Sequence, residues 1–356
     1  MNEPPFAIDR PVTVFNTSDL SSPSPFPAEN DLDRYFESYW ETYIACYQRG
    51  RACEQAERYR EALVRYEAAI DIDPTQFDGW YRRANVLVEF GDYHQALESL
   101  DRALEIDDQS YWGWYGRGCI LWEYLGEPEA ALASFEQAIR IHPDDYWAWY
   151  RRGYLLAEEF ELFDAAIECF DAAIDARPQD FWAWYRRGNA QRYAKRYRAA
   201  VRSYDRAIAQ RPDDYWAWLR RGDCFASLGD RPTAIECYDR TIAIDHTGFW
   251  GWCKRADLLR QLGQLEAAIT SYDQAIAIDP YDSVLWYNRA CCFALGGNSS
   301  AAIGSLQQSY ICNPTTTRTS ILSDRDLDPI RTTPEFTTWL KTNPMSEQPR
   351  DPDASF

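Results

Sequence analysis

The sequence lacks the features on which membrane insertion and most catalytic sites depend. No run of apolar residues approaches the roughly 18 needed to cross a bilayer, and the N-terminus shows no basic-then-apolar signal layout. The motifs GxxxxGK, GxGxxG, HExxH and GxSxG are missing, as is an EF-hand loop. Histidine is scarce, and His94, His142 and His246 have no partners at metal-binding spacing. We therefore expect a soluble, cytoplasmic protein that is not an enzyme, does not insert into a membrane, and needs no metal or cofactor.

CxxC pairs are also missing, although the chain has ten cysteines. None of the cysteines has a histidine at zinc spacing. The interpretation we favour is a set of free thiols, buried or half-buried in the fold. Free thiols agree with the reducing cytosol.

Positive charge is in short supply as well, since the net charge is −19. General nucleic-acid binding depends on clustered Lys and Arg, so the overall charge argues against it. The charge is uneven, however. Residues 181–214 carry nine basic residues against three acidic ones, a surplus of six. A contact with RNA through this segment is therefore kept as one alternative.

Aromatic residues, by contrast, are plentiful and regularly placed. On a helix, positions i and i+2 point about 160° apart, so two tryptophans at that spacing cannot enter the same core. One ring of each pair should pack, and the other should face something else. Such pairs open five helical tracts: Tyr111-Trp112-Gly113-Trp114, Tyr146-Trp147-Ala148-Trp149, Phe181-Trp182-Ala183-Trp184, Tyr215-Trp216-Ala217-Trp218 and Phe249-Trp250-Gly251-Trp252.

The second tryptophan of each pair fixes a repeat period of 34 or 35 residues. Small, aromatic and proline residues recur in phase after it, and an earlier copy at residues 50–74 keeps these marks but has Cys46 in place of the tryptophan. The tryptophans of the series are Trp80, Trp114, Trp149, Trp184, Trp218, Trp252 and Trp286; typical downstream marks are Ala131, Phe135, Ala138 and Pro143. In period and marks the chain resembles the tetratricopeptide-repeat (TPR) family over about three-quarters of its length. The resemblance implies an all-α fold, a right-handed superhelical solenoid of antiparallel helix pairs.

The expected organisation is eight repeats between capping segments. The repeats are placed at residues 43–76, 77–110, 111–145, 146–180, 181–214, 215–248, 249–282 and 283–316. In repeat two we expect helices at 77–90 and 93–106. Residues 31–42 should extend the first helix as an N-terminal cap. Residues 317–343 should form a C-terminal cap, in which a polar stretch precedes short helices at 326–330 and 334–340 with Leu327, Ile330, Phe336 and Trp339 on the apolar face. Residues 1–30 and 344–356 are expected to be disordered tails.

The TPR resemblance implies a binding surface on the first helix of each repeat. In that family, positions 2, 5, 9, 12 and 13 of the repeat line the concave groove, and position 2 does not require tryptophan, so the five rings there are this chain's own feature. Large aromatic side chains dominate binding hot spots. The alternative is that neighbouring rings stack sideways and stiffen the superhelix. The residues expected to bind a partner are Trp112, Tyr115, Trp122, Trp147, Tyr150, Arg151, Tyr154, Trp182, Tyr185, Arg186, Asn189, Arg192, Tyr193, Trp216, Arg220, Trp250, Lys254 and Arg260.

Two sets of basic residues need separate interpretations. Position 6 carries Arg82, Arg151, Arg186, Arg220 and Lys254 on the flank of the groove. Together with Arg192 and Arg260 we expect them to form a cationic rim in repeats four to seven, with solvated surface charge as the alternative. An acidic group of a ligand could dock on this rim, as in clamp-type TPR proteins, although their Lys and Asn set is only partly matched. Position 7 carries an arginine in all eight repeats, and position 25, on the second helix, supplies a carboxylate in every repeat but the last, which has Gln307. Because a buried guanidinium requires a partner, we predict a ladder of Arg-carboxylate pairs with a structural role.

The function that these features favour is a protein-interaction adaptor or assembly factor. It would hold an extended segment of another protein, acidic or containing Pro and aromatic residues, in a tryptophan-lined groove. The repeats are similar to TPR proteins of photosynthetic and filamentous bacteria, several of which aid assembly of membrane or photosynthetic complexes, so such a complex is one expected partner. The alternatives are a carbohydrate or small-ligand binder that uses the tryptophan faces, and the RNA-contacting adaptor described above.

Overall fold

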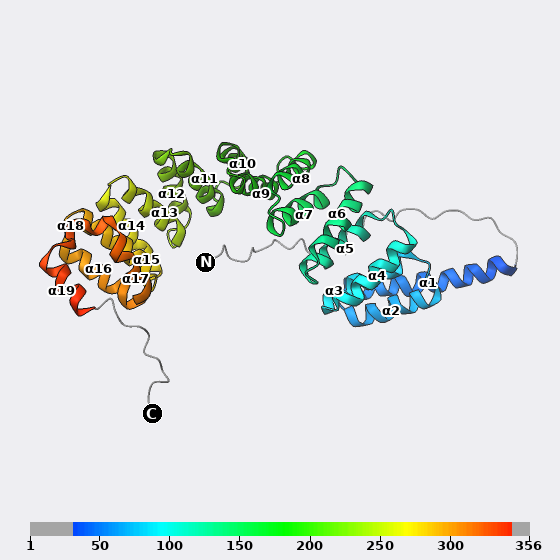
Figure 1. Cartoon of the computed structure of the whole chain (residues 1–356). Helices are drawn as coiled ribbons and strands as arrows, with labels where there is room; N and C mark the ends of the chain where they lie inside the picture. The colour runs from blue at the N-terminus through cyan, green and yellow to red at the C-terminus, as the bar shows by residue number, and fades with distance from the viewer. Residues whose placement is uncertain (1–30, 344–356) are drawn as a thin grey trace, which may run out of the picture. The chain divides into compact units, whose positions relative to one another are not determined.

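The described part of the chain is built of consecutive helices joined by short turns. A computed structural model describes residues 31–343 (Figure 1), so the predicted tails at 1–30 and 344–356 lie outside the described residues. The chain divides into two compact units, residues 1–177 and 178–356. The first unit contains helices α1 (Asp31–Gln55), α2 (Tyr59–Ile72), α3 (Phe77–Phe90), α4 (Tyr93–Ile106), α5 (Tyr111–Glu123), α6 (Pro128–Ile141), α7 (Tyr146–Glu158) and α8 (Phe163–Ala176).

The second unit continues the same pattern and ends in shorter helices. It contains α9 (Phe181–Tyr193), α10 (Tyr197–Gln210), α11 (Tyr215–Leu228), α12 (Arg231–Ile244), α13 (Phe249–Gln261), α14 (Leu265–Ile278), α15 (Ser283–Leu295), α16 (Ser299–Cys312), α17 (Pro314–Ser323), the 3₁₀ turn η1 (Arg325–Leu327), α18 (Asp328–Arg331) and α19 (Pro334–Thr342). Within the described residues of both units the fold is an all-α helical repeat. None of these helices is both long and apolar enough to cross a membrane.

Local chemistry explains where the helices begin and end. The predicted helices of repeat two coincide with α3 and α4. Side chains such as those of Ser110, Asp180 and Asp214 accept a hydrogen bond from an N–H of the first helical turn and so cap it. Gly91 ends α3 with φ 76°, a left-handed conformation that glycine adopts without strain. Capping residues and glycines therefore divide the chain into hairpins as the sequence pattern indicates.

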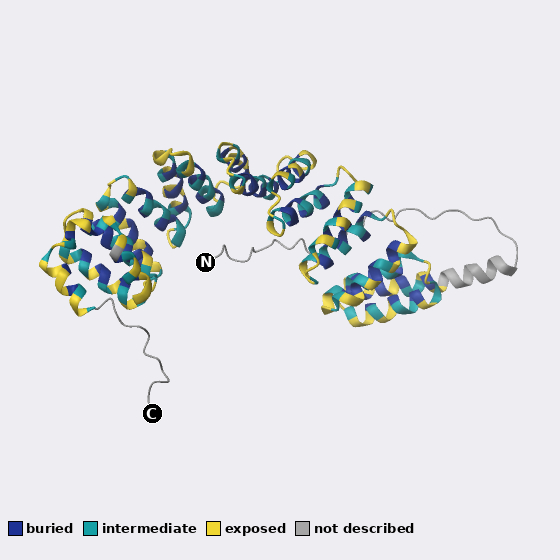
Figure 2. Ribbon diagram, in the orientation of Figure 1, coloured by how far each residue is buried: buried dark blue, intermediate teal, exposed yellow. Residues whose placement is uncertain are grey.

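The core lies between the two helices of each hairpin, where the buried residues gather (Figure 2). In several hairpins a small residue on the first helix faces a large ring on the second. Phe135, Phe170, Tyr204 and Tyr238 are almost completely buried. A Cβ atom added at Gly118 would lie 2.6 Å from the ring of Phe135, and one added at Gly222 would lie 2.6 Å from the ring of Tyr238. In such hairpins, glycine on the first helix makes room for the ring that lies between the two helices.

The predicted arginine ladder is present in both units. The Nε atom of Arg117 donates to Asp101 at 2.7 Å, and the Nε of Arg221 donates to Asp205 at 2.7 Å. The other pairs are Arg83–Glu67, Arg152–Glu136, Arg255–Asp239 and Arg289–Asp273, at 2.6–3.3 Å. A second nitrogen of each arginine donates to the next helix, to a serine such as Ser134 or to a cysteine such as Cys237. Each arginine therefore ties three successive helices together.

The second tryptophan of each pair also has a structural role. Its indole N–H donates to the backbone carbonyl six residues earlier, for example Trp114 to Asp108 at 2.8 Å and Trp218 to Pro212 at 2.8 Å. All seven members of the series make this bond, at 2.7–2.9 Å. The guanidinium of the position-7 arginine lies over several of these rings. That of Arg221, for example, is 5.4 Å from the centroid of Trp218. These indoles hold the loop that joins one repeat to the next.

The ends of the array agree with the prediction in part. Helix α1 runs without a break from Asp31 into the first repeat. At the other end Leu327, Ile330, Phe336 and Trp339 are buried together against α15 and α16, as predicted. The sequence analysis assigned no helix to the polar stretch after Pro314, and this segment forms helix α17. Asn313 caps α17, Pro314 occupies its first turn, and Ile321 is buried, which outweighs the low helix propensity of its threonines.

Candidate functional site

The first tryptophan of each pair lies in the first turn of a repeat and is half-buried. Each ring meets the preceding aromatic residue edge to face, as Trp112 does with Tyr111 at 4.9 Å between ring centroids and Trp216 with Tyr215 at 5.2 Å. All five of these rings, Trp112, Trp147, Trp182, Trp216 and Trp250, keep an intermediate exposure. None of the five is sealed in the core, and none is fully exposed. Each ring therefore offers part of its surface to solvent.

Some of these rings pack on the preceding repeat. Trp112 packs against the cluster that contains Tyr81, and Trp250 packs against the cluster that contains Leu219. In the second unit the first helices are neighbours, since α11 contacts α9 and α13, and α13 contacts α15. We call the side formed by these first helices the first-helix face. The row of rings therefore contributes to packing between repeats while it remains partly accessible.

Arginines at the ends of repeats lie over some of these rings, a feature that the sequence analysis missed. The guanidinium of Arg177 is 4.9 Å from the centroid of Trp147, and that of Arg211 is 5.3 Å from Trp182. Arg220 lies 5.5 Å from Trp216. Cation–π contacts of this kind hold the loop arginine near the indole. The available signal was a basic residue directly before Pro178 and Pro212.

The other predicted site residues differ in accessibility. Tyr115, Tyr185 and Asn189 are buried, so little of their surface can reach a ligand. Trp122 and Tyr154 are half-buried and meet edge to face at 5.1 Å; Tyr150 is also half-buried. Tyr193 is exposed. Only some of these aromatic residues are therefore open to a ligand.

The predicted cationic rim is wrong for three of its members. Arg82, Arg151 and Arg186 are buried, with 5–8% of their surface exposed. Arg151 pairs with Glu123, and Arg82 pairs with Glu54 at 3.5 Å. A charge that is desolvated and paired in this way fixes neighbouring first helices relative to one another. It is neither an open rim nor a solvated surface charge.

Positive charge does remain accessible further along the first-helix face. Arg220 pairs with Asp223 at 3.2 Å, and Lys254 approaches the same carboxylate at 3.8 Å. Arg192 and Arg260, at position 12 of repeats five and seven, are half-buried. The cationic part of the predicted site is therefore confined to repeats five to seven.

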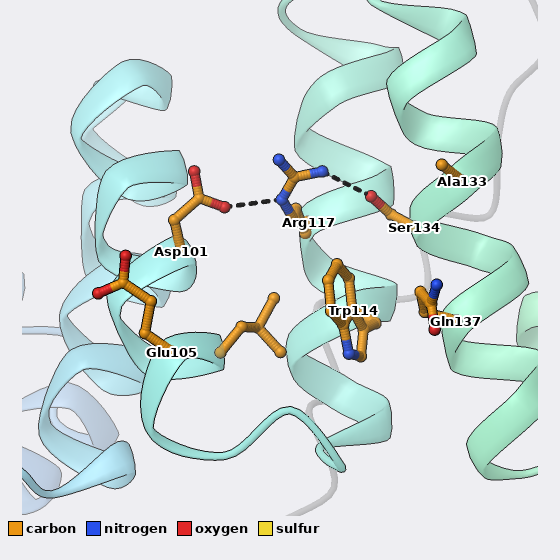
Figure 3. Close-up of a pocket in the computed structure, with 8 residues that line it drawn as sticks. Asp101, Glu105, Trp114, Arg117, Ala133, Ser134 and Gln137 are labelled. Atoms are coloured by element: carbon orange, nitrogen blue, oxygen red, sulfur yellow. Dashed lines mark hydrogen bonds and ion pairs between the residues drawn. The ribbon is translucent and has the colours of Figure 1, made fainter.

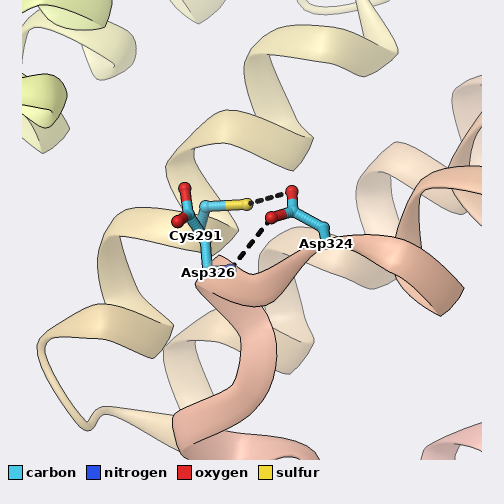
Figure 4. A group of neighbouring side chains, drawn as sticks. All are labelled: Cys291, Asp324 and Asp326. Carbon is cyan, nitrogen blue, oxygen red and sulfur yellow. Dashed lines mark hydrogen bonds between the residues drawn. The ribbon is translucent and has the colours of Figure 1, made fainter.

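The segment after helix α17 packs on this face and supplies carboxylates to it. Asp326 pairs with Arg260, while Asp324 accepts from the hydroxyl of Tyr287 at 3.0 Å and from the thiol of Cys291 at 3.6 Å (Figure 4). Burial, with Asp324 adding to it, raises the pKa of Cys291, so this thiol stays protonated. Arg260 and Tyr287 already satisfy the two carboxylates, which explains the cluster without a metal ion.

A separate pocket of about 520 Å³ lies on the ladder side of the first unit (Figure 3). It is lined by Asp101, Leu104, Glu105, Trp114, Arg117, Ala133, Ser134 and Gln137, from helices α4, α5 and α6. Arg117 lies inside it and bonds to both Asp101 and Ser134. Arg117 and Asp101 are therefore engaged in the ladder, while Glu105 pairs with Arg102 at 2.9 Å. The sequence analysis did not identify this hollow.

Repeated antiparallel helical hairpins define the class of α-helical repeat proteins. Sequence profiles for the tetratricopeptide repeat match residues 55–113, 115–181 and 185–247, and a TPR repeat profile matches residues 256–290. The chain belongs to the tetratricopeptide-repeat family. No curated protein sequence matches the chain significantly.

Solved structures similar to the chain are TPR proteins. PilF of Pseudomonas aeruginosa is 18% identical, with 62% of this chain and 99% of PilF covered at a TM-score of 0.50. A TPR protein of Parabacteroides merdae is 17% identical, with 70% and 98% covered at 0.49. YrrB, described as a TPR protein with an unusual peptide-binding site, is 25% identical, with 53% and 97% covered at 0.46. The likeness to PilF concerns the fold alone.

Proposed function

We propose that this protein is a non-enzymatic TPR adaptor or assembly factor that holds an extended segment of a partner protein against its row of position-2 tryptophans. TPR proteins bind other proteins, and this general role suits the fold. The observation that carries the finer proposal is the uniform half-burial of Trp112, Trp147, Trp182, Trp216 and Trp250. Five indoles at one position, each anchored on one side and accessible on another, provide rigid contact area at low entropic cost.

The spacing of the rings suits an extended segment. Helices that pack side by side lie about 10 Å apart. Three residues of a polyproline II chain, which rises about 3.1 Å per residue, span a similar distance. A segment that presents one apolar or aromatic side chain every third residue would therefore meet successive rings within a unit.

The carbohydrate alternative is less well supported than the protein one. Sugar platforms need open ring faces, whereas guanidinium groups lie over Trp147, Trp182 and Trp216. The RNA alternative is weakened because Arg186 is buried. Exposed arginines of the basic segment remain on α10, at Arg198 and Arg202. Binding through them should collapse with salt, whereas aromatic-anchored binding should weaken only moderately.

The state of the cysteines bears on the compartment in which the protein works. All ten cysteines are free, seven of them buried, and free thiols favour a reducing compartment, for which we propose the cytoplasm. Assembly of a membrane or photosynthetic complex remains our proposed context, through a partner's extended segment.

The proposal is tested by comparing the two tryptophans of one pair. Peptides are selected from a displayed library on the full-length protein, and their affinities are measured for wild type, Trp216→Ala and Trp218→Ala. Loss of Trp216 should lower affinity about tenfold or more, as at a hot spot. Loss of Trp218, which bonds to Pro212, should lower the unfolding temperature and leave affinity within about twofold in the folded protein. Equal affinities for wild type and Trp216→Ala would refute the proposed groove.

A further inference from the structure

We propose that Arg192 is a binding site for a carboxylate side chain of an acidic segment in a partner protein. This inference rests on the proposed function and names the chemistry of the segment that the first-helix face of the second unit would hold. It is drawn from a comparison of two equivalent positions in the same unit. One of them is occupied by the chain's own carboxylate.

The occupied position is Arg260, at position 12 of repeat seven. Its guanidinium pairs with Asp326, a residue 66 positions further along the chain in η1. The same guanidinium is hydrogen-bonded to the hydroxyl of Tyr272, which donates to Asp257 at 2.6 Å. The chain thus folds an acidic segment onto its own first-helix face and anchors it by one Asp-Arg pair.

Arg192 repeats this arrangement at position 12 of repeat five. Its guanidinium is hydrogen-bonded to the hydroxyl of Tyr204, which donates to Asn189 at 2.7 Å. Burial raises the pKa of both Tyr204 and Tyr272, so both hydroxyls stay protonated. The arginine and the tyrosine are the same at the two positions. The carboxylate is not, since no acidic residue in the described part of the chain pairs with Arg192.

The charge around Arg192 also differs in the direction that favours an anion. Asn189 is neutral where repeat seven has Asp257. Arg220 lies close enough to act electrostatically against the charge on Arg192. Asp223 already pairs with Arg220 and Lys254. A cation that is half-buried, beside another cation and without a paired carboxylate gains free energy from an incoming one.

The remaining repeats do not offer this site. At position 12 they carry Glu54, Val88, Trp122, Ala157, Ala226 and Ala294. Position 12 therefore has an arginine only in repeats five and seven, and the arginine of repeat seven, Arg260, already pairs with Asp326. The Nε atoms of Arg192 and Arg260 are both buried without a hydrogen-bond acceptor, so the two positions differ in the carboxylate that Arg260 receives from Asp326.

The experiment uses the full-length protein and a fluorescein-labelled peptide that copies residues 320–331, the segment that contains Asp326. Fluorescence anisotropy gives its affinity, and a second probe has asparagine at the position of Asp326. We expect the aspartate probe to bind wild type about tenfold more tightly than the asparagine probe. Arg192→Gln should remove this preference, and Arg192→Lys should restore part of it. Salt at about 1 M, where the Debye length is about 3 Å, should weaken the preference.

Arg260→Gln is the matched control, because it makes the same change where the chain supplies its own carboxylate. It should leave probe affinity unchanged, and thermal unfolding should show that both glutamine variants remain folded. Equal binding of the two probes to wild type overturns the inference, as does a loss in Arg260→Gln with none in Arg192→Gln. A dimer that Arg192→Gln converts to monomer in sedimentation also overturns it, since the occupant is then a second copy.

Failure of this inference is distinguishable from failure of the proposed function. If Trp182→Ala weakens both probes equally while Arg192→Gln changes neither, the tryptophan groove stands and the carboxylate site falls. If Arg192→Gln abolishes the aspartate preference while Trp182→Ala has no effect, the carboxylate site stands and the groove falls.

Discussion

Removal of one arginine from the ladder should loosen a single junction between repeats. Arg221 donates to Asp205 at 2.7 Å and to the sulfur of Cys237 at 3.0 Å. Its guanidinium also lies over the rings of Trp218 and Phe225, at 5.4 and 4.8 Å. These groups belong to three helices, α10, α11 and α12. The change Arg221→Met keeps the apolar stem and removes the charge and its donors.

The expected cost can be assembled from these contacts. A hydrogen bond to a charged group contributes about 1.5–3 kcal/mol, and the lower end applies here because the Asp205 side chain is 49% exposed. Each cation–π contact adds about 0.5–1 kcal/mol. Arg221→Met should therefore lower the free energy of unfolding by about 2–3 kcal/mol, and Asp205→Asn should lower it by about 1 kcal/mol. The double variant should show a coupling of about 1 kcal/mol between the two residues.

The assay is urea unfolding followed by helical circular dichroism, fitted with a nearest-neighbour repeat scheme. Because the pair contributes to an interface between repeats, its loss should also broaden the transition. The matched control is Arg240→Met, since Arg240 and Asp213 are 3.9 Å apart with side chains 53% and 83% exposed. That control should change stability by less than about 0.5 kcal/mol. A coupling between Arg221 and Asp205 within about 0.3 kcal/mol of zero would refute the structural role of the ladder.

Two further predictions concern alkaline pH and the C-terminal cap. Burial raises the pKa of Tyr215 to about 12 and raises the pKa of Tyr238 and Tyr272 further. Because the pKa is raised on folding, this stabilisation is complete below the unfolded value of about 10 and is lost as pH rises through the folded values. Helicity and phenolate absorbance should therefore change together above about pH 10; full ionisation of tyrosine with helicity intact would contradict this. Asp326→Asn should release the cap from Arg260 and accelerate tryptic cleavage after Arg325 by about 5- to 30-fold, the effect of 1–2 kcal/mol. Asp328→Asn, in an exposed pair with Arg331, should leave cleavage unchanged, and equal rates for the two variants would count against the docking role of Asp326.

The periodic part of the structure could be predicted because each rule acts within one repeat. The tryptophan period, the capping residue and the glycine facing a ring each involve residues on one hairpin or at its junction with the next. The arginine ladder could also be predicted from the sequence, because a cation on a buried face requires an acceptor and a carboxylate recurs at constant spacing. Helix α17 was missed, since its threonines have low propensity and only burial of Ile321 compensates.

Accessibility was harder to predict than position. A helical wheel gives the direction of Arg151 but not its neighbour Glu123, which lies 28 residues earlier on another helix. The pair of Arg260 with Asp326 joins residues 66 apart and follows no period. The arginines over Trp147 and Trp182 come from loops, whose paths the repeat pattern does not fix. The binding role of the tryptophan row stays a prediction.

The last step of the arginine ladder has a consequence for the length of the protein. Where a ninth arginine would need an acidic acceptor, the chain has Gln307, whose amide oxygen receives the indole N–H of Trp339 at 2.7 Å. If a further hairpin were added after Cys312, its position-7 arginine would have no carboxylate to pair with. The hairpin would also have to displace the ring of Trp339 from Gln307. Gln307 therefore ends the arginine ladder. To add a hairpin, Gln307 would have to be replaced with aspartate and the segment that carries Trp339 removed.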